Sequence, residues 1–424
     1  MELLLLNLVA LFRPLMSIKY VESTFEIIGV GLFGALVAGM LVHTALTKSL
    51  RLSAIDGIIA AFTIWCVCIY VIYFEYANAS DVAKLLIPLF GYMVVKNVVD
   101  DHYKYTRLLL WIIVGFSIPT IASAALIATG NPYAIETILY YSGLARWEGV
   151  YTGSHTLGHS MTLFVMTMVL YITLRRNAEG NTAQPSRQVQ NILLGVLSAL
   201  ALYCLYMSQV RSALLGLLTF AVIYLYHYSK KLLILGAISL AVIAVLTIQQ
   251  WLPALSPEYA ATQKGVDVDM MDMGSGRPTR WKNDIMTFAN APIDQKIAGF
   301  GIGARGEDLS RPGERLYGHS DWLEILTQTG LVGLILFATL QILFLKAIFR
   351  MPRTERFAFL ALLAAVNVMM VVSNSYVWRI QVCQLYYMIL AFIEVPANRV
   401  QTEQFTVRAT KLGTTAFQRP TTTV

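Results

Sequence analysis

The chain has 424 residues, of which 57% are hydrophobic and only 13% are charged. A soluble domain carries about 25% charged residues, so this composition excludes an ordinary soluble protein and indicates an integral membrane protein. The formal net charge is +7, but the Lys and Arg residues lie between apolar runs, where membrane topology explains them better than nucleic-acid binding does.

The apolar runs are continuous rather than alternating. This favours membrane-spanning helices, because a helix satisfies its own backbone hydrogen bonds in hydrocarbon. At about 20 residues per span, the sequence predicts an all-α polytopic membrane protein with about 12 transmembrane helices. They are expected to begin near residues 2, 24, 52, 83, 107, 155, 189, 211, 231, 321, 355 and 380.

The predicted organisation has four parts. Transmembrane helices occupy residues 1–249 and 321–396, a periplasmic loop with short helices and catalytic elements occupies 250–320, and a basic, Thr-rich tail expected to be disordered occupies 397–424. Residues 1–12 have no positive region before them, and Arg13 and Pro14 stand where a signal cleavage site would lie. This segment is therefore expected to be a short or tilted membrane helix. The four cysteines lie inside apolar runs and are interpreted as core residues: Cys66, Cys68, Cys204 and Cys383.

The positions of the cations predict the orientation. One alternate set of connections is rich in Lys and Arg, and the positive-inside rule places this set and both termini in the cytoplasm. The opposite set is external, which in a Gram-negative cell means the periplasm. It comprises residues 130–154, 208–211, the long loop and 373–381. Several basic residues fall on this side against the usual bias and indicate an anionic ligand: Arg146, Arg211, Arg277, Arg280, Arg379 and His319.

Arg211 opens an apolar run at the external mouth of a predicted helix. An arginine there can simply extend to the interface, but arginine near hydrocarbon tends to face a bundle interior or a water-filled cavity. In the long loop, Arg277 precedes Pro278, which is favoured at the first helical position. Trp281 then marks the apolar face of a short amphipathic helix. Arg277 and Arg280 are three residues apart and can point the same way. They fit either an interfacial helix or a cradle for a diphosphate.

His319 lies just before a predicted helix whose expected cap is Asp321, with Glu324 as the capping-box partner. The positive helix end disfavours the imidazolium and leaves a neutral ring that can accept a proton. A loop histidine without a role is the alternative. We expect a functional histidine because of the arginines on the same side. Gly330 and Gly333 are expected to allow close packing of the helix behind it.

Three other groups have competing interpretations. The loop aspartates suit either a divalent cation or plain solvation, and the first is the weaker interpretation: Asp267, Asp269 and Asp272. His155 and His159 are four apart at an external helix start and fit a metal or substrate site or incidental histidines. The third group fits a surface for sugar or lipid, although an interfacial aromatic belt explains its tyrosines equally well: Arg146, Trp147, Glu148, Tyr140, Tyr141 and Tyr151.

The order of these motifs resembles a known family. The arginine at the helix start in 208–215 precedes Ser275-Gly276-Arg277 with Trp281. The glycine-rich stretch 299–303 and then His319, Gly330 and Gly333 follow. This order is similar to the O-antigen ligase and polymerase superfamily, which includes pilin-type O-oligosaccharyltransferases. Ser320 is a departure, since many members have asparagine after the histidine.

The resemblance implies a membrane glycosyltransferase with a GT-C-like fold and a periplasmic active site in the bacterial inner membrane. Its donor would be a glycan on undecaprenyl diphosphate. In ligases the acceptor is a sugar hydroxyl of the lipid A–core oligosaccharide, and the product is lipopolysaccharide. The family is regarded as metal-independent, and no cofactor is expected.

The residues and the resemblance together predict an inverting transfer. His319 is the expected general base, and Arg211 and Arg277 the expected diphosphate clamp. The predicted substrate-binding residues are Arg280, Arg146, His155, Trp281 and Tyr151. A polymerase or protein O-oligosaccharyltransferase of the same superfamily is the alternative enzyme, and a transporter or flippase of a polyanionic lipid is the alternative outside enzymes. The sequence specifies neither the sugars nor the oligomeric state.

Overall fold

The structure is a computed structural model that describes residues 2–47, 50–74, 79–138, 145–179, 185–236, 238, 277–303, 307–308, 311–315, 320–373 and 379–395. Of residues 20–33, 177–179, 185–187, 307–308 and 311–315 it describes the backbone only.

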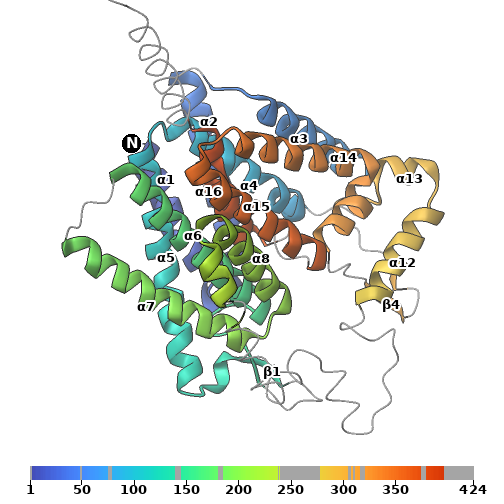
Figure 1. The fold of residues 1–424 in the computed structure, drawn as a ribbon. Helices are drawn as coiled ribbons and strands as arrows, with labels where there is room; N and C mark the ends of the chain where they lie inside the picture. Colours follow the sequence, from blue (N-terminus) through green and yellow to red (C-terminus); the bar gives the residue numbers. More distant parts are fainter. Residues whose placement is uncertain are drawn as a thin grey trace, which may run out of the picture.

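Most of the described chain is helical, as the apolar runs predict (Figure 1). The amino-terminal helices are α1 (Glu2–Phe12), the 3-10 turn η1 (Pro14–Ser17), α2 (Lys19–Thr47), α3 (Ala54–Ile72), α4 (Ala79–Val98), α5 (His102–Ala128), α6 (Ser154–Glu179), α7 (Pro185–Ser208) and α8 (Arg211–Tyr228). The carboxy-terminal helices are α14 (Asp321–Phe349), α15 (Arg353–Val372), α16 (Ile380–Leu390) and the turn η4 (Ala391–Glu394). Helices α8, α14, α15 and α16 begin within a few residues of their predicted starts.

Six of the described helices are long and apolar enough to cross a membrane: α3, α5, α6, α7, α14 and α15. The chain is thus a multi-pass membrane protein by the length and composition of its helices. Helix α1 has 11 residues, which at 1.5 Å per residue reach about 16 Å, roughly half of the hydrocarbon thickness. It is too short to cross alone. The total of about 12 spans stays a prediction.

Helix α6 is the centre of the bundle. In its membrane-length window 83% of the residues are buried, compared with 33% for α3, α7 and α14. It packs against α5, α7, α8, α15 and α16. Polar side chains on α6 therefore need partners inside the protein, and Thr162 Oγ1 donates to the carbonyl of Ala213 on α8 at 3.1 Å. A central, well-packed helix fixes the position of the residues at its start.

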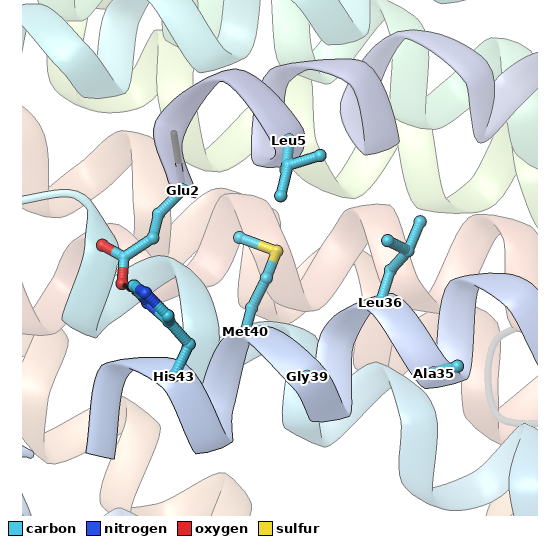
Figure 2. Close-up of a pocket in the computed structure, with 7 residues that line it drawn as sticks. All are labelled: Glu2, Leu5, Ala35, Leu36, Gly39, Met40 and His43. Atoms are coloured by element: carbon cyan, nitrogen blue, oxygen red, sulfur yellow. Dashed lines mark hydrogen bonds and ion pairs between the residues drawn. The ribbon is translucent and has the colours of Figure 1, made fainter. Parts of the chain in front are cut away.

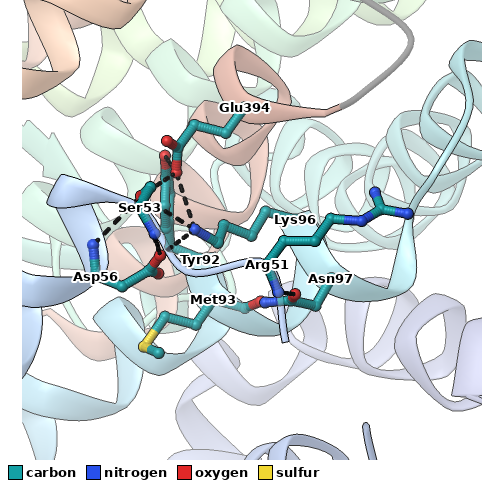
Figure 3. A network of polar contacts seen from close by, with 8 residues as sticks. All are labelled: Arg51, Ser53, Asp56, Tyr92, Met93, Lys96, Asn97 and Glu394. Atoms are coloured by element: carbon teal, nitrogen blue, oxygen red, sulfur yellow. Dashed lines mark hydrogen bonds and ion pairs between the residues drawn. The ribbon is translucent and has the colours of Figure 1, made fainter. Parts of the chain in front are cut away.

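A buried charge network joins α3, α4 and η4 (Figure 3). Ser53 caps α3 in a capping box with Asp56. The ammonium group of Lys96, whose side chain is 2% exposed, forms ion pairs with Asp56 and, at 3.1 Å, with Glu394. Tyr92 donates its hydroxyl to Glu394 at 2.9 Å. This network ties the last turn of the described chain to the amino-terminal helices.

A shallow groove lies between α1 and α2 (Figure 2). Its walls are apolar apart from Glu2 and His43 at one end, where His43 Nδ1 lies 2.8 Å from a Glu2 carboxylate oxygen. Thr44 donates to the same oxygen at 3.2 Å. At the polar end of the groove, the Glu2 carboxylate thus already has hydrogen-bond partners in the protein.

Short strands accompany the helices. Strand β1 (Ile135–Ile138), which follows the turn η2 (Pro132–Ala134), pairs antiparallel with β2 (Ala145–Trp147) between α5 and α6. Strands β3 (Glu307–Asp308) and β4 (Arg311–Arg315) form a second two-stranded pair. The all-α prediction is therefore confirmed in its helical character, with two small hairpins that sequence reasoning did not predict.

The large polar segment is attached to the bundle through α14. It contains α12 (Arg277–Asn290) and α13 (Ile293–Ala298), which lie beside α14 at the right of Figure 1. The glycine-rich stretch after α13 meets the first half of α14, where Phe300 N donates to Thr327 O at 2.8 Å. Gly303 N also donates to Gln328 Oε1 at 3.0 Å.

Gly330 makes this contact possible. It interrupts α14 with φ of 69°, a left-handed conformation that residues with a Cβ rarely adopt. A Cβ at this position would lie 2.1 Å from the carbonyl oxygen of Ile297. The kink also frees the carbonyl of Thr329, which accepts a hydrogen bond from Trp65 Nε1 at 2.9 Å. The expectation that Gly330 allows close packing is confirmed.

Gly330→Ala should therefore destabilise the protein, because the substitution adds both backbone strain and a steric clash with Ile297. We expect a loss of about 2–4 kcal/mol, measured as a lower thermal unfolding midpoint in detergent. Gly195→Ala on α7 is the matched control, since nothing lies within 4 Å of its added Cβ. Equal midpoints for the two variants would contradict this role of Gly330.

Lys96→Met should also be destabilising, because it leaves Asp56 and Glu394 buried without the ammonium group between them. Removing one partner of a buried ion pair costs about 3–5 kcal/mol. Lys104→Met serves as the control, since its pairs with Asp100 and Asp101 lie at the surface and contribute about 1 kcal/mol or less. A midpoint for Lys96→Met no lower than that of the control would refute the stabilising role.

Candidate functional site

One end of the bundle brings together the segments that the sequence predicts to be external. The β1–β2 hairpin links α5 to α6, and a short turn links α7 to α8. The start of α14 meets the end of α15, where Asp321 N donates to Ser373 O at 3.2 Å. Arg379, at the start of α16, donates to the hydroxyl of Thr156 on α6. Residues far apart in the sequence therefore share one surface.

Arg146 lies on β2 and reaches the end of α7 and the start of α6. Its Nε donates to the carbonyl of Ser208 at 3.4 Å, and its Nη2 lies 3.0 Å from Nε2 of His155. A carboxylate oxygen of Glu136 is 3.9 Å away. Burial lowers the pKa of Arg146, and the charge of Arg211 lowers it further, whereas Glu136 raises it. Arg146 stays charged, but in surroundings that disfavour the charge.

The turn before Arg211 is held against α6. Gln209 adopts φ of 54°, and a Cβ on Gly158 would lie 2.8 Å from the side chain of Val210. This close approach leaves little freedom for Ser208 and Val210. Arg211 therefore begins α8 beside the start of α6, half-buried and within electrostatic range of Arg146.

Arg277 begins α12 and anchors it to the bundle. Its Nη1 donates to the carbonyl of Val372 at the end of α15, at 2.8 Å. Burial is the main cause of a lowered pKa for Arg277. The positive charges of Arg211, Arg146 and Arg280 lower it further. Arg277 on α12 thus interacts electrostatically with Arg146 on β2, Arg211 on α8 and its neighbour Arg280. The predicted helix after Arg277 is confirmed, and it places Arg277 with Arg211 and Arg146.

His319 lies outside the described residues, but the next residue is placed. Ser320 is the N-cap of α14: its hydroxyl oxygen accepts a hydrogen bond from Leu323 N, and its O–H donates to Met370 O at 3.4 Å. The prediction that Asp321 is the cap is therefore wrong. The hydroxyl of Ser320 satisfies the helix end one residue earlier, and Asp321 becomes a buried first helical residue. Ser320 lies against the end of α15, the same segment that Arg277 contacts.

His155 and His159 lie on the first turns of α6 and face the arginines. Their rings are roughly parallel, with centroids 6.1 Å apart. His159 Nδ1 donates to the carbonyl of His155 at 2.7 Å, and Ser212 lies 3.2 Å from His159 Nε2. Among the described residues, no group of three or more His, Cys, Asp or Glu side chains is placed to hold a metal ion. In this part of the chain the two rings hydrogen-bond to protein groups.

The remaining predicted residues lie in the core, on α12, at the same end of the bundle or outside the described residues. Tyr151 is fully buried in the core and pairs through its backbone with Ile18. Trp281 lies partly buried on α12, one residue after Arg280. Arg379, which the sequence places on the external side without a specific role, turns out to contact α6. Other predicted positions lie outside the described residues: Asp267, Asp269, Asp272, Tyr140 and Tyr141.

The gathering of several guanidinium groups in this region suits an anionic ligand. Arg146, Arg211 and Arg277 interact with one another, Arg280 interacts with Arg277, and the carboxylate of Glu136 acts on Arg146. Bringing like charges together in partly buried surroundings is unfavourable unless a counter-charge is supplied. Guanidinium groups match phosphate oxygens with paired hydrogen bonds. A ligand with several anionic oxygens would satisfy this site.

Part of the chain matches a known protein family. Residues 196–338 match the family described as O-antigen ligase. The match extends from α7 into α14 and includes Arg211, Arg277 and Arg280. The chain's resemblance to the O-antigen ligase superfamily is therefore confirmed over this segment. No curated protein sequence matches the chain.

Inorganic diphosphate should bind to this arginine cluster and raise the unfolding midpoint of the purified protein. Arg277→Gln should weaken that binding about tenfold or more, because it removes a charged donor and relieves repulsion that the ligand would otherwise offset. Higher salt should weaken binding to the parent. Arg107→Gln, at the other end of α5, is the control. If Arg277→Gln and the control bind diphosphate equally, the cluster is not an anion site.

Proposed function

We propose that this protein is a membrane glycosyltransferase that transfers a glycan from undecaprenyl diphosphate to a sugar hydroxyl of the lipid A–core oligosaccharide. This is the reaction of an O-antigen ligase. The proposal rests chiefly on the gathering of Arg146, Arg211 and Arg277 at the bundle end where α14 begins. The family match over residues 196–338 supports the same class of reaction.

In this proposal the arginines bind the leaving diphosphate. Arg211 and Arg277, with Arg280, stabilise the negative charge that grows on the diphosphate as the glycosidic bond breaks. Fixed cations in a partly dry site are effective where charge develops, because they need little reorganisation during the reaction. The hydrogen bond from Arg277 to Val372 holds the first turn of α12 in place for this role.

His319 is the proposed general base. It would take the proton from the attacking sugar hydroxyl while the diphosphate leaves from the opposite side of the anomeric carbon. Direct displacement inverts that centre. The bond formed is the new glycosidic bond, the bond broken joins the glycan to the diphosphate, and the proton moves to the imidazole. Its neighbour Ser320 lies against the end of α15, the segment that Arg277 contacts.

The membrane setting fits a polyprenyl donor. The isoprenoid chain would lie in the lipid between helices, and the diphosphate would lie at the water–lipid boundary. Diphosphate is a good leaving group, so the transfer needs neither ATP nor a metal ion. We place the site on the periplasmic face of the inner membrane, with both termini in the cytoplasm, because the cation-rich connections favour the cytoplasmic side.

Reconstitution with lipid-linked glycan and lipid A–core acceptor tests the proposal. His319→Ala should reduce transfer roughly 10²–10⁴-fold, since it removes the base. Arg277→Ala should reduce transfer on the order of a hundredfold or more. His43→Ala, in the groove between α1 and α2, should transfer as the parent does. Parent-like transfer in both site variants would remove the proposed machinery.

The same assay separates the alternatives. A polymerase would extend a second lipid-linked repeat instead of the lipid A–core acceptor, and a protein O-oligosaccharyltransferase would modify a polypeptide. A flippase would move the labelled lipid across the bilayer without forming a glycosidic bond. Loss of transfer on adding a chelator would favour a metal at the loop aspartates over the metal-independent mechanism.

A further inference from the structure

The imidazole of His155 has one nitrogen engaged and one without a partner. Nε2 lies 3.0 Å from Nη2 of Arg146. A guanidinium group can only donate hydrogen bonds, so Nε2 must accept. In a neutral imidazole the proton then resides on Nδ1. The Arg146 contact therefore fixes the tautomer of His155 as the Nδ1–H form.

A second proton on His155 is disfavoured by the same geometry. A proton on Nε2 would abolish the hydrogen bond from Arg146 and place two cations 3.0 Å apart. Arg379 and Arg277 also interact electrostatically with this ring. His155 is therefore a neutral hydrogen-bond donor with no lone pair free to accept a proton, and it is unsuited to act as a general base.

His159 fixes the first turn of α6, from which His155 projects. Its Nδ1 donates to the carbonyl of His155 at 2.7 Å, which leaves its Nε2 to accept from the hydroxyl of Ser212 at 3.2 Å. Ser212 directly follows Arg211 at the start of α8. The two histidines thus connect β2, α6 and α8, and the His155 ring has little rotational freedom.

Nδ1 of His155 is buried and has no hydrogen-bond partner in the described part of the chain. Unpartnered buried donors are uncommon in native proteins and require an explanation. A ligand oxygen could accept a hydrogen bond from Nδ1 without breaking an existing hydrogen bond to this atom. The surrounding charges belong to Arg146, Arg277 and Arg379, which favour an anionic oxygen.

We propose that His155 is a positioning residue that donates its Nδ1–H to a phosphoryl oxygen of the bound diphosphate. This inference rests on the proposed function for the identity of the ligand. His155 adds a short, directional donor to the longer guanidinium groups. In the proposed reaction the two histidines have different roles. His155 donates a hydrogen bond to the diphosphate, and His319 accepts the proton of the acceptor sugar hydroxyl.

Two amide substitutions separate the ring nitrogens. In His155→Asn the side-chain amide takes the position of Nδ1, and in His155→Gln it takes that of Nε2. The Asn variant should bind inorganic diphosphate within about threefold of the parent, whereas the Gln variant should bind roughly 10- to 100-fold more weakly, the range for a hydrogen bond to a charged group. Calorimetry on purified protein in nanodiscs measures both. His102→Asn and His102→Gln, at the start of α5, are the controls and should not change binding.

Equal effects of the Asn and Gln variants would overturn the inference, and so would weaker binding by Asn than by Gln, because a ring that only held Arg146 through Nε2 would tolerate Gln better than Asn. If the Gln variant does not fold, nitrogen-15 NMR of histidine-labelled parent gives a second test. A neutral Nδ1–H signal that is absent from His155→Asn should shift when diphosphate is added. A His155 signal in the Nε2–H form, or one insensitive to diphosphate, would contradict the inference.

The outcome also separates this inference from the proposed function. Diphosphate binding that distinguishes Asn from Gln, without glycan transfer by the parent, would keep the role of His155 and reject the glycosyltransferase. Transfer by the parent, with no difference between the two variants, would keep the enzyme and reject the role of His155.

Discussion

The proposed site depends on repulsion between partly buried guanidinium groups. Arg146, Arg211 and Arg277 come from a hairpin and two helices, yet they interact at one end of the bundle. Burial and neighbouring arginines lower the pKa values of Arg146 and Arg277, and the carboxylate of Glu136, 3.9 Å from Arg146, acts in the opposite direction. The protein holds the cluster together through backbone contacts, of which Arg277 to Val372 is the clearest. An anion with several oxygens would offset the repulsion that acts on Arg146 and Arg277, so we expect the cluster to bind one.

Two rigid elements keep the cluster in place. Helix α6 is the most buried of the six membrane-length helices, so its first turn presents His155 and Thr156 from a fixed position. The left-handed Gly330 divides α14 and lets the stretch after α13 pack against Thr327. The segment that contains α12 and Arg277 therefore packs against α14. The proposed transfer would occur at the water–lipid boundary, whereas α6 and α14, which position the site residues, belong to the helix bundle.

Much of this arrangement was readable from the sequence, because continuous apolar runs and helix-start signals are local. The starts of α8, α14 and α16 and the helix after Arg277 were predicted, and so was the common side of Arg146, Arg211 and Arg277. Ser320 was not predicted as the N-cap because Asp321 and Glu324 match the pattern of a capping box. The choice between Ser320 and Asp321 depends on tertiary contacts with α15. The β1–β2 hairpin, the Arg379–Thr156 contact and the tautomer of His155 depend on residues brought together by the fold, which no local pattern encodes.

The central claim is that Arg211 and His319 share one external pocket for a diphosphate-linked lipid. Single Arg211→Cys and His319→Cys variants, made in a chain whose four native cysteines are replaced, can be labelled with a membrane-impermeant maleimide in vesicles of known orientation. The account predicts that both positions label from the periplasmic side and that added undecaprenyl-diphosphate-linked glycan slows both reactions together. Labelling of the two positions from opposite faces of the membrane would contradict it.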